Sequence, residues 1–71
     1  MSAEEQIFTT SKEMFVRTSL CLNKKIEAFC ALKKMELLVN DYLKNPNPKT
    51  SILVYLAWEE FSEIYKKWLN N

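Results

Sequence analysis

The chain has 71 residues, of which 48% are hydrophobic and 27% charged, and its formal net charge is +1. It contains no histidine and no glycine. These absences exclude histidine-based triads and metal sites as well as glycine-rich phosphate-binding loops. We therefore expect a protein that is not an enzyme, with no catalytic residue, metal or other cofactor.

A chain of this length forms one domain, 1–71, whose own core supplies only ~3–5 kcal/mol. Its hydrophobic content exceeds what a small monomer readily buries. We expect a protein partner or a homodimer to cover the remainder, with a tightly packed monomer as the alternative.

The first helix is predicted over about residues 3–20. A Ser or Thr followed three residues later by Glu forms a capping box. There are two such pairs, Ser2 with Glu5 and Thr10 with Glu13. We favour a start at the earlier pair, because the apolar residues between the two pairs lie on the same face as the apolar residues that follow them.

A break is predicted next, between residues 18 and 23, where Thr, Ser and Asn are poor helix-interior residues. Helical spacing crosses this stretch without a phase shift, and a seven-residue repeat runs beside it, formed by Phe8, Phe15, Leu22 and Phe29. The alternative is one helix of ~63 Å, twice as long as the last helix, in an intertwined oligomer.

The middle helix, about 24–44, carries apolar residues on two sides. One side contains Ala28, Ala31, Leu32, Met35, Leu38, Val39, Tyr42 and Leu43, and the other contains Leu22, Ile26, Phe29, Cys30 and Leu37. A helix of this kind is packed between neighbours. This suits a three-helix arrangement in which it contacts both other helices, or a dimer in which its second side meets another copy.

The last helix is predicted over about 48–69, after the sequence Asn45-Pro46-Asn47-Pro48. Asn47 is a good cap, and Pro48 suits the first helical position. So short a connection brings the helix back along its predecessor. The predicted fold class is therefore all-α: a small antiparallel bundle of two or three helices. A buried strand over 52–58 is the alternative, but it lacks a partner strand.

Two sets of apolar residues follow from the helical periodicity of 48–69. A stripe of Val54, Trp58, Phe61 and Tyr65 is predicted to be core. The predicted partner-binding residues lie off this stripe or near the chain end, where Tyr and Trp favour interfaces. They are Ile52, Tyr55, Leu56 and Trp68.

Charged residues and cysteines have simpler interpretations. The lysines at 24, 25, 33 and 34 spread around a helix among glutamates, and the glutamates at 59, 60 and 63 form a solvated face. Cys21 and Cys30 are nine residues apart. On one helix that places them ~13 Å apart, too far for a disulfide, so we expect reduced thiols.

We conclude that the sequence predicts a protein-binding module, namely an adaptor, chaperone or inhibitor, which self-associates. The alternative is a nucleic-acid-binding regulator whose lysines converge in a dimer. No apolar run reaches the ~20 residues of a membrane span, and the N-terminus is acidic where a secretory signal is basic. We therefore expect a cytoplasmic location.

Overall fold

Three helices make up the protein in its computed structural model, which describes residues 2–69 and the side chains of residues 2–66. They are α1 (Ala3–Arg17), α2 (Leu22–Lys44) and α3 (Pro48–Leu69). No strand occurs within residues 2–69. The predicted all-α class is confirmed, with three helices packed together, and the strand proposed over 52–58 is wrong.

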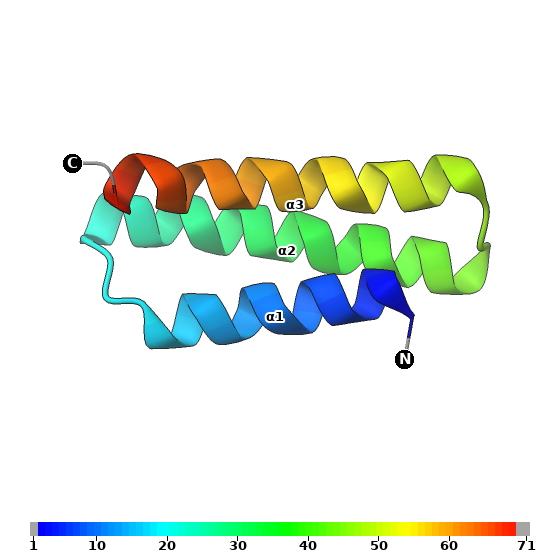
Figure 1. The fold of residues 1–71 in the computed structure, drawn as a ribbon, viewed down its shortest axis with the longest axis horizontal. Coiled ribbons are helices and arrows are strands. Elements are labelled where there is room, and N and C mark those ends of the chain that lie inside the picture. Colours follow the sequence, from blue (N-terminus) through cyan, green and yellow to red (C-terminus); the bar gives the residue numbers. More distant parts are fainter. Residues whose placement is uncertain (1, 70–71) are drawn as a thin grey trace.

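The helices lie side by side along a rod of 38 × 17 × 16 Å. In Figure 1, α1 and α3 run from right to left and α2 runs from left to right between them. The α1–α2 connection therefore lies at one end of the rod and the α2–α3 connection at the other.

The first helix begins at the earlier of the two capping boxes. Glu5 N–H donates to Ser2 Oγ over 3.2 Å, and Ser2 N–H donates to Glu5 Oε1 over 3.2 Å. The helix ends at Arg17 rather than near residue 20, because Thr18 adopts an extended backbone (φ −87°, ψ 128°). The cap amide of Thr18 still donates to Met14 O, which satisfies one of the last carbonyls.

The break lies within the stretch where the sequence predicted it. Cys21, with φ −63° and ψ 160°, precedes a helix that starts at Leu22 rather than near residue 24. The single long helix is therefore wrong. α1 folds back along α2 instead of extending away from it.

The start of α3 is held by Asn47 and Thr50. Asn47 Oδ1 accepts hydrogen bonds from the amides of Lys49 (2.9 Å) and Thr50 (3.1 Å). In return, Asn47 N–H donates to Thr50 Oγ1 over 3.2 Å. This reciprocal pair satisfies amides that the first helical turn leaves without partners.

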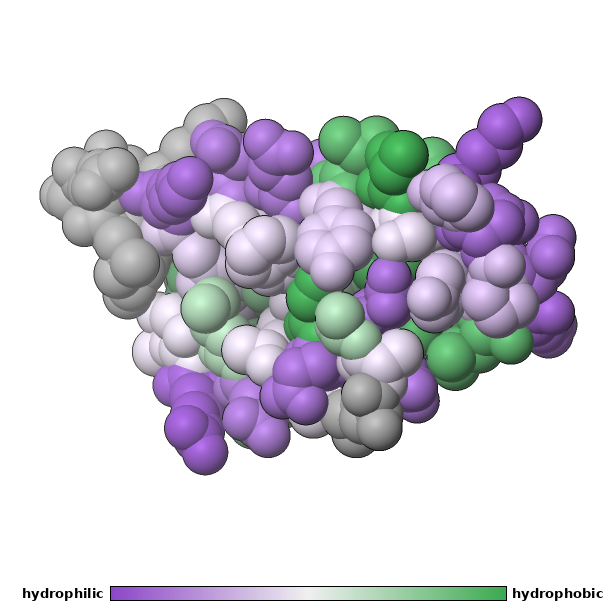
Figure 2. Space-filling view, turned by 45° about the vertical axis from the view of Figure 1, so that its right-hand side comes forward, coloured by the Kyte–Doolittle hydropathy of each residue, from purple (hydrophilic) through white to green (hydrophobic). Residues whose placement is uncertain are grey.

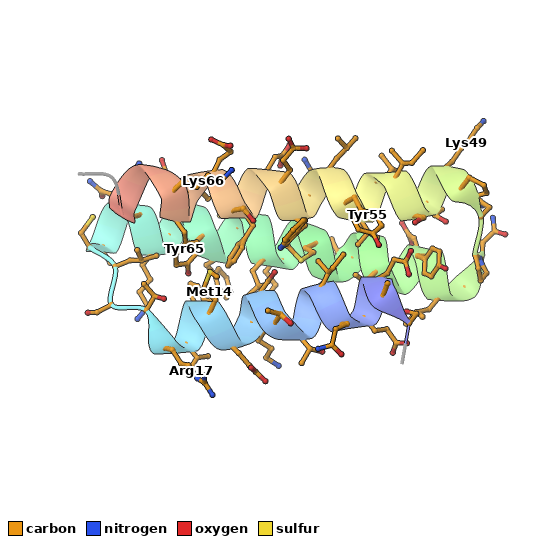
Figure 3. The ribbon with its side chains drawn as sticks, viewed as in Figure 1. Met14, Arg17, Lys49, Tyr55, Tyr65 and Lys66 are labelled. Carbon is orange, nitrogen blue, oxygen red and sulfur yellow. The ribbon has the colours of Figure 1, made fainter. Side chains whose placement is uncertain are left out.

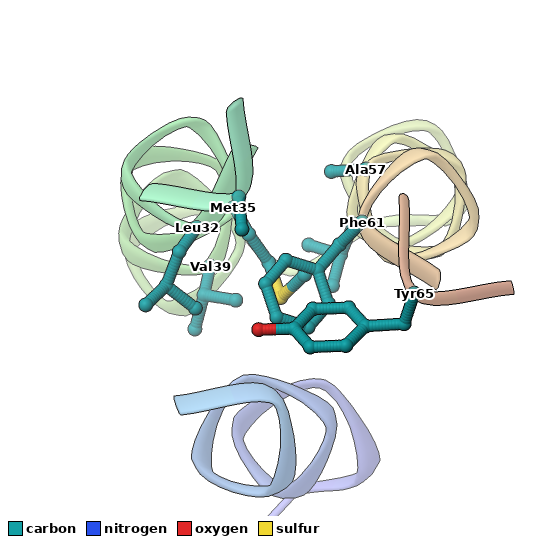
Figure 4. Close-up of a cluster of buried hydrophobic side chains, with 8 residues drawn as sticks. Leu32, Met35, Val39, Ala57, Phe61 and Tyr65 are labelled. Atoms are coloured by element: carbon teal, nitrogen blue, oxygen red, sulfur yellow. The ribbon is translucent and has the colours of Figure 1, made fainter. Parts of the chain in front are cut away.

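The core is formed by one side of α2 and one side of α3 (Figure 4). Its buried residues are Ala28, Leu32, Met35, Val39, Val54, Ala57, Phe61 and Tyr65. The rings of Phe61 and Tyr65 lie 4.9 Å apart between centroids. Ile7, Phe8 and Phe15 of α1 are partly buried against this cluster, so α1 covers a core that α2 and α3 build.

One predicted core residue lies elsewhere. Trp58 is 43% exposed, whereas Phe61 is 1% exposed and Tyr65 4%. Trp58 follows the buried Ala57 by ~100° around the helix. It therefore lies at the edge of the buried stripe, where so large a side chain remains partly in solvent.

The second side of α2 is not packed between neighbours as expected. α1 and α3 share the first side, and on the second side Leu22, Ile26 and Leu37 are exposed. Phe29 lies at the boundary, with its ring centroid 6.1 Å from that of Phe15. Both neighbours therefore approach α2 from the same half of its circumference.

We predict that Phe61→Ala destabilises the protein by about 3–5 kcal/mol, because it removes a fully buried ring from the contact between α2 and α3. Trp58→Ala, the matched control, should cost only about 1 kcal/mol, because the indole is already partly solvated. Urea denaturation followed by circular dichroism measures both. Equal costs for the two substitutions would contradict the assignment of the core.

The Tyr65 hydroxyl is buried in the core and has no hydrogen-bond partner among the described residues. Burial raises the pKa of Tyr65 above its ordinary value of 10.0, because the ionised phenolate is poorly solvated there. Since the folded pKa exceeds the unfolded one, this contribution to stability is complete below pH 10 and is lost as the pH rises through the folded pKa.

We therefore expect Tyr65→Phe to leave stability near pH 7 unchanged or slightly higher and to reduce the loss of stability in alkali. Tyr55→Phe is the control, since that ring is exposed. Thermal melts between pH 8 and pH 11 measure the effect. An unchanged alkaline loss in Tyr65→Phe would contradict it.

Candidate protein-binding surface

The predicted partner-binding residues of α3 that the structure describes are all exposed, by 57% for Ile52, 41% for Tyr55 and 51% for Leu56. Ile52 and Leu56 each lie two residues from the buried Val54, or ~160° around the helix, and so point away from the core. Tyr55 points instead in the direction of α1 in Figure 3. The fourth residue, Trp68, lies outside the side chains that the structure describes.

The side of α3 that faces α1 is fixed by a contact between Ser51 and Glu4. The Ser51 hydroxyl donates to Glu4 Oε2 over 2.7 Å, and the Glu4 side chain belongs to a buried residue. Ser51 and Glu60 are nine residues apart, or about two and a half turns, so they point to opposite sides of α3. Glu60 therefore lies on the side of α3 that faces away from α1.

An ion pair connects α2 and α3 on that same side. Lys34 Nζ lies 3.2 Å from Glu60 Oε2, and both side chains are more than half exposed. Leu37 follows Lys34 by three residues and Leu56 precedes Glu60 by four, so each leucine lies about one turn from the ion pair. Because α2 and α3 run in opposite directions in Figure 1, both turns lead towards the same end.

Leu37 and Leu56 therefore lie at about the same level on the side of the α2–α3 pair that carries the ion pair, both exposed, and Leu53 continues the apolar surface along α3. Figure 2 shows hydrophobic side chains gathered at the top of the molecule, over α3. We call the side of the α2–α3 pair that faces away from α1 the outer face. From α2 it contains Ile26, Cys30, Lys34 and Leu37, and from α3 it contains Leu53, Leu56, Glu60 and Ile64.

On the other side of the ion pair, the outer face has an open groove of about 520 Å³. Its lining residues are Lys24, Ile26, Glu27, Cys30, Glu60, Glu63 and Ile64. The outer face thus has exposed leucines on one side of the charged pair and, on the other side, a groove lined by Ile26, Cys30 and Ile64 among charged residues. Of the partner-binding residues predicted from the sequence, only Leu56 belongs to the outer face. The second side of α2 was expected to pack against another helix or against a second copy.

A smaller groove of about 200 Å³ lies between α1 and α2. It is lined by Phe8, Lys12, Phe15, Val16, Phe29, Leu32, Lys33 and Glu36. Three members of the seven-residue repeat in the sequence meet here, although they come from two helices. Lys33 Nζ lies 5.6 Å from the Phe29 ring centroid, so the lysine side chain partly covers the apolar floor of this groove.

Three of the four lysines that nucleic-acid binding would use lie beside glutamates. Lys24 Nζ lies 3.2 Å from Glu27 Oε2, and Lys33 Nζ lies 3.5 Å from Glu36 Oε1. Lys34 pairs with Glu60 on the neighbouring helix, so its charge is balanced as well. Such local pairing weakens the positive field that a phosphate backbone requires.

Within residues 2–69 no group of three or more Cys, Asp or Glu could hold a metal ion. Cys21 and Cys30 are both exposed and free. In the described part of the chain, no helix is long and apolar enough to span a bilayer.

Comparison with protein-family models, curated proteins and solved structures found no match to this chain.

We predict that Leu56→Ser changes the free energy of unfolding by about 0.5 kcal/mol or less, because this side chain is half exposed on the outer face. Val54→Ser, two residues away and fully buried, should cost about 2–4 kcal/mol. Both are measured by urea denaturation at the lowest usable protein concentration, where association does not contribute. A large loss in Leu56→Ser would show that this side chain belongs to the core.

Proposed function

We propose that this chain is an antiparallel three-helix protein-binding module that acts in the cytoplasm as an adaptor, chaperone or inhibitor and has no enzymatic activity. The observation that carries the proposal is the outer face, where Leu37, Leu53 and Leu56 remain exposed on the same side of two well-packed helices. An apolar patch rimmed by charged residues is typical of protein interaction sites.

The mechanism is completion of a helical bundle. A partner helix laid along α2 and α3 would insert its apolar residues beside Leu37 and Leu56. The supporting core, with Met35 and Phe61 on the opposite sides of these helices, keeps the patch in one geometry. A rigid patch of this kind loses little conformational entropy on binding.

Charge favours a protein partner over a membrane. The apolar residues of α3 are followed by Glu59, Glu60 and Glu63, whereas a helix lying in a membrane interface carries lysines on its polar face. The pairing of Lys24, Lys33 and Lys34 with glutamates likewise favours protein over nucleic acid.

Site-specific photocross-linking tests the proposal. A benzophenone amino acid replaces Leu56 on the outer face, or Gln6, which is exposed on α1. We expect discrete adducts to other proteins at position 56 in the native cells and none at position 6. The proposal would be contradicted if adducts to other proteins were absent at position 56 or were the same at both positions. Adducts to nucleic acid would favour the alternative regulator.

A further inference from the structure

The distribution of charge on the outer face suits one particular partner. Lys34 and Glu60 lie side by side, with Cys30 and Ile64 to one side of them and Leu37 and Leu56 to the other. This ion pair contributes little to the stability of the monomer, because both its side chains are exposed. Placed in a helix interface, such a polar layer instead fixes the register of the helices.

We propose that the outer face is covered by a second copy of this chain, so that α2 and α3 of both copies form a four-helix core with α1 of each copy on the outside. This inference rests on the proposed function and specifies its first partner. The two copies are related by a two-fold axis parallel to the helices, which places α2 of one copy over α3 of the other.

The charges select this arrangement. A two-fold axis along the helices preserves the level of every residue, so Lys34 of each copy lies over Glu60 of the other. The four side chains then form a ring in which positive and negative charges alternate. An axis perpendicular to the helices at this level would place Lys34 over Lys34 and Glu60 over Glu60, and like charges in an interface are unfavourable.

The apolar zones match in the same register. Leu37 of one copy lies over Leu56 of the other, one turn from the charged ring, and the relation is repeated by symmetry. At the opposite end, Cys30 of each copy lies over the neighbourhood of Ile64 of the other. The exposed second side of α2, which neither α1 nor α3 covers, is buried in this dimer.

The size of the outer face is close to that of known interfaces. One side of the rod, 38 × 17 Å, projects to roughly 650 Å². A standard specific interface takes about 800 Å² from each partner. The outer face of one copy therefore offers about the area that a stable dimer requires.

Charge reversal tests the register. In sedimentation equilibrium at high concentration, we expect the wild-type protein to have twice the chain mass of 8.4 kDa. Lys34→Glu places four negative charges in the ring and Glu60→Lys places four positive ones, so each variant alone should dimerise about 10- to 100-fold more weakly. An equimolar mixture of the two should recover wild-type affinity, because every contact between the copies then joins opposite charges.

Lys12→Glu is the matched control, because it makes the same change of charge on α1, away from the outer face. It should dimerise like the wild type. Circular dichroism melts of all variants should remain cooperative, because Lys34 and Glu60 are exposed. Any of three results would overturn the proposal. The wild type could remain monomeric at millimolar concentration, Lys12→Glu could weaken dimerisation as much as the other two variants, or the mixture could fail to recover wild-type dimer affinity.

The inference and the proposed function fail in different ways. A wild-type monomer whose position 56 still cross-links to other proteins would overturn the dimer and leave the binding module intact. A dimer with the expected charge dependence, whose position 56 cross-links only to itself, would confirm the inference and contradict the adaptor, chaperone or inhibitor role.

Discussion

The contact between α2 and α3 is the interaction on which the remaining structure depends. Met35 and Val54 are fully buried between these helices, and Phe61 and Tyr65 extend the contact towards the α1–α2 connection. A chain of 71 residues is too short to surround two helices of this length on every side. The single remaining helix, α1, covers one side of the pair through Ile7, Phe8 and Phe15. The outer face is therefore a consequence of the fold, since two long helices and one short helix leave one side of the pair without a neighbour.

Register between α2 and α3 determines what the outer face displays. Asn47 and Thr50 fix the first turn of α3 directly after the end of α2, and the Lys34–Glu60 pair aligns the two helices further along. With the register set, Leu37 and Leu56 lie on the same side of the helix pair although they are far apart in the sequence. A shift of α3 by one residue would rotate Leu56 by ~100° away from that side. The buried contacts between α2 and α3 supply most of the energy that holds this register, and the weaker polar contacts agree with it.

Much of the local structure was predictable because it depends on neighbouring residues. The Ser2–Glu5 capping box, the break after Arg17 and the burial of Phe61 and Tyr65 follow from spacing and side-chain chemistry. Long-range packing was not predictable in this way. The sequence shows two apolar sides on α2, but only the placement of α1 decides which side is covered. Trp58 was expected in the core because periodicity locates a stripe without giving its width. The α3 residues Ile52 and Leu56 were identified because they lie off that stripe, whereas Leu37 and Cys30 required the fold.

Alkylation of the two native thiols across a dilution series tests the central claim most directly. Cys30 lies on the outer face, and Cys21 lies in the α1–α2 connection at the end of the rod; both thiols are exposed in the monomer. If a second copy covers the outer face, the alkylation rate of Cys30 should fall as protein concentration rises, in proportion to the dimer fraction, while the rate of Cys21 stays constant. If the alkylation rate of Cys30, like that of Cys21, did not change with concentration in a sample whose mass shows dimers, the account would be contradicted and the interface would lie elsewhere.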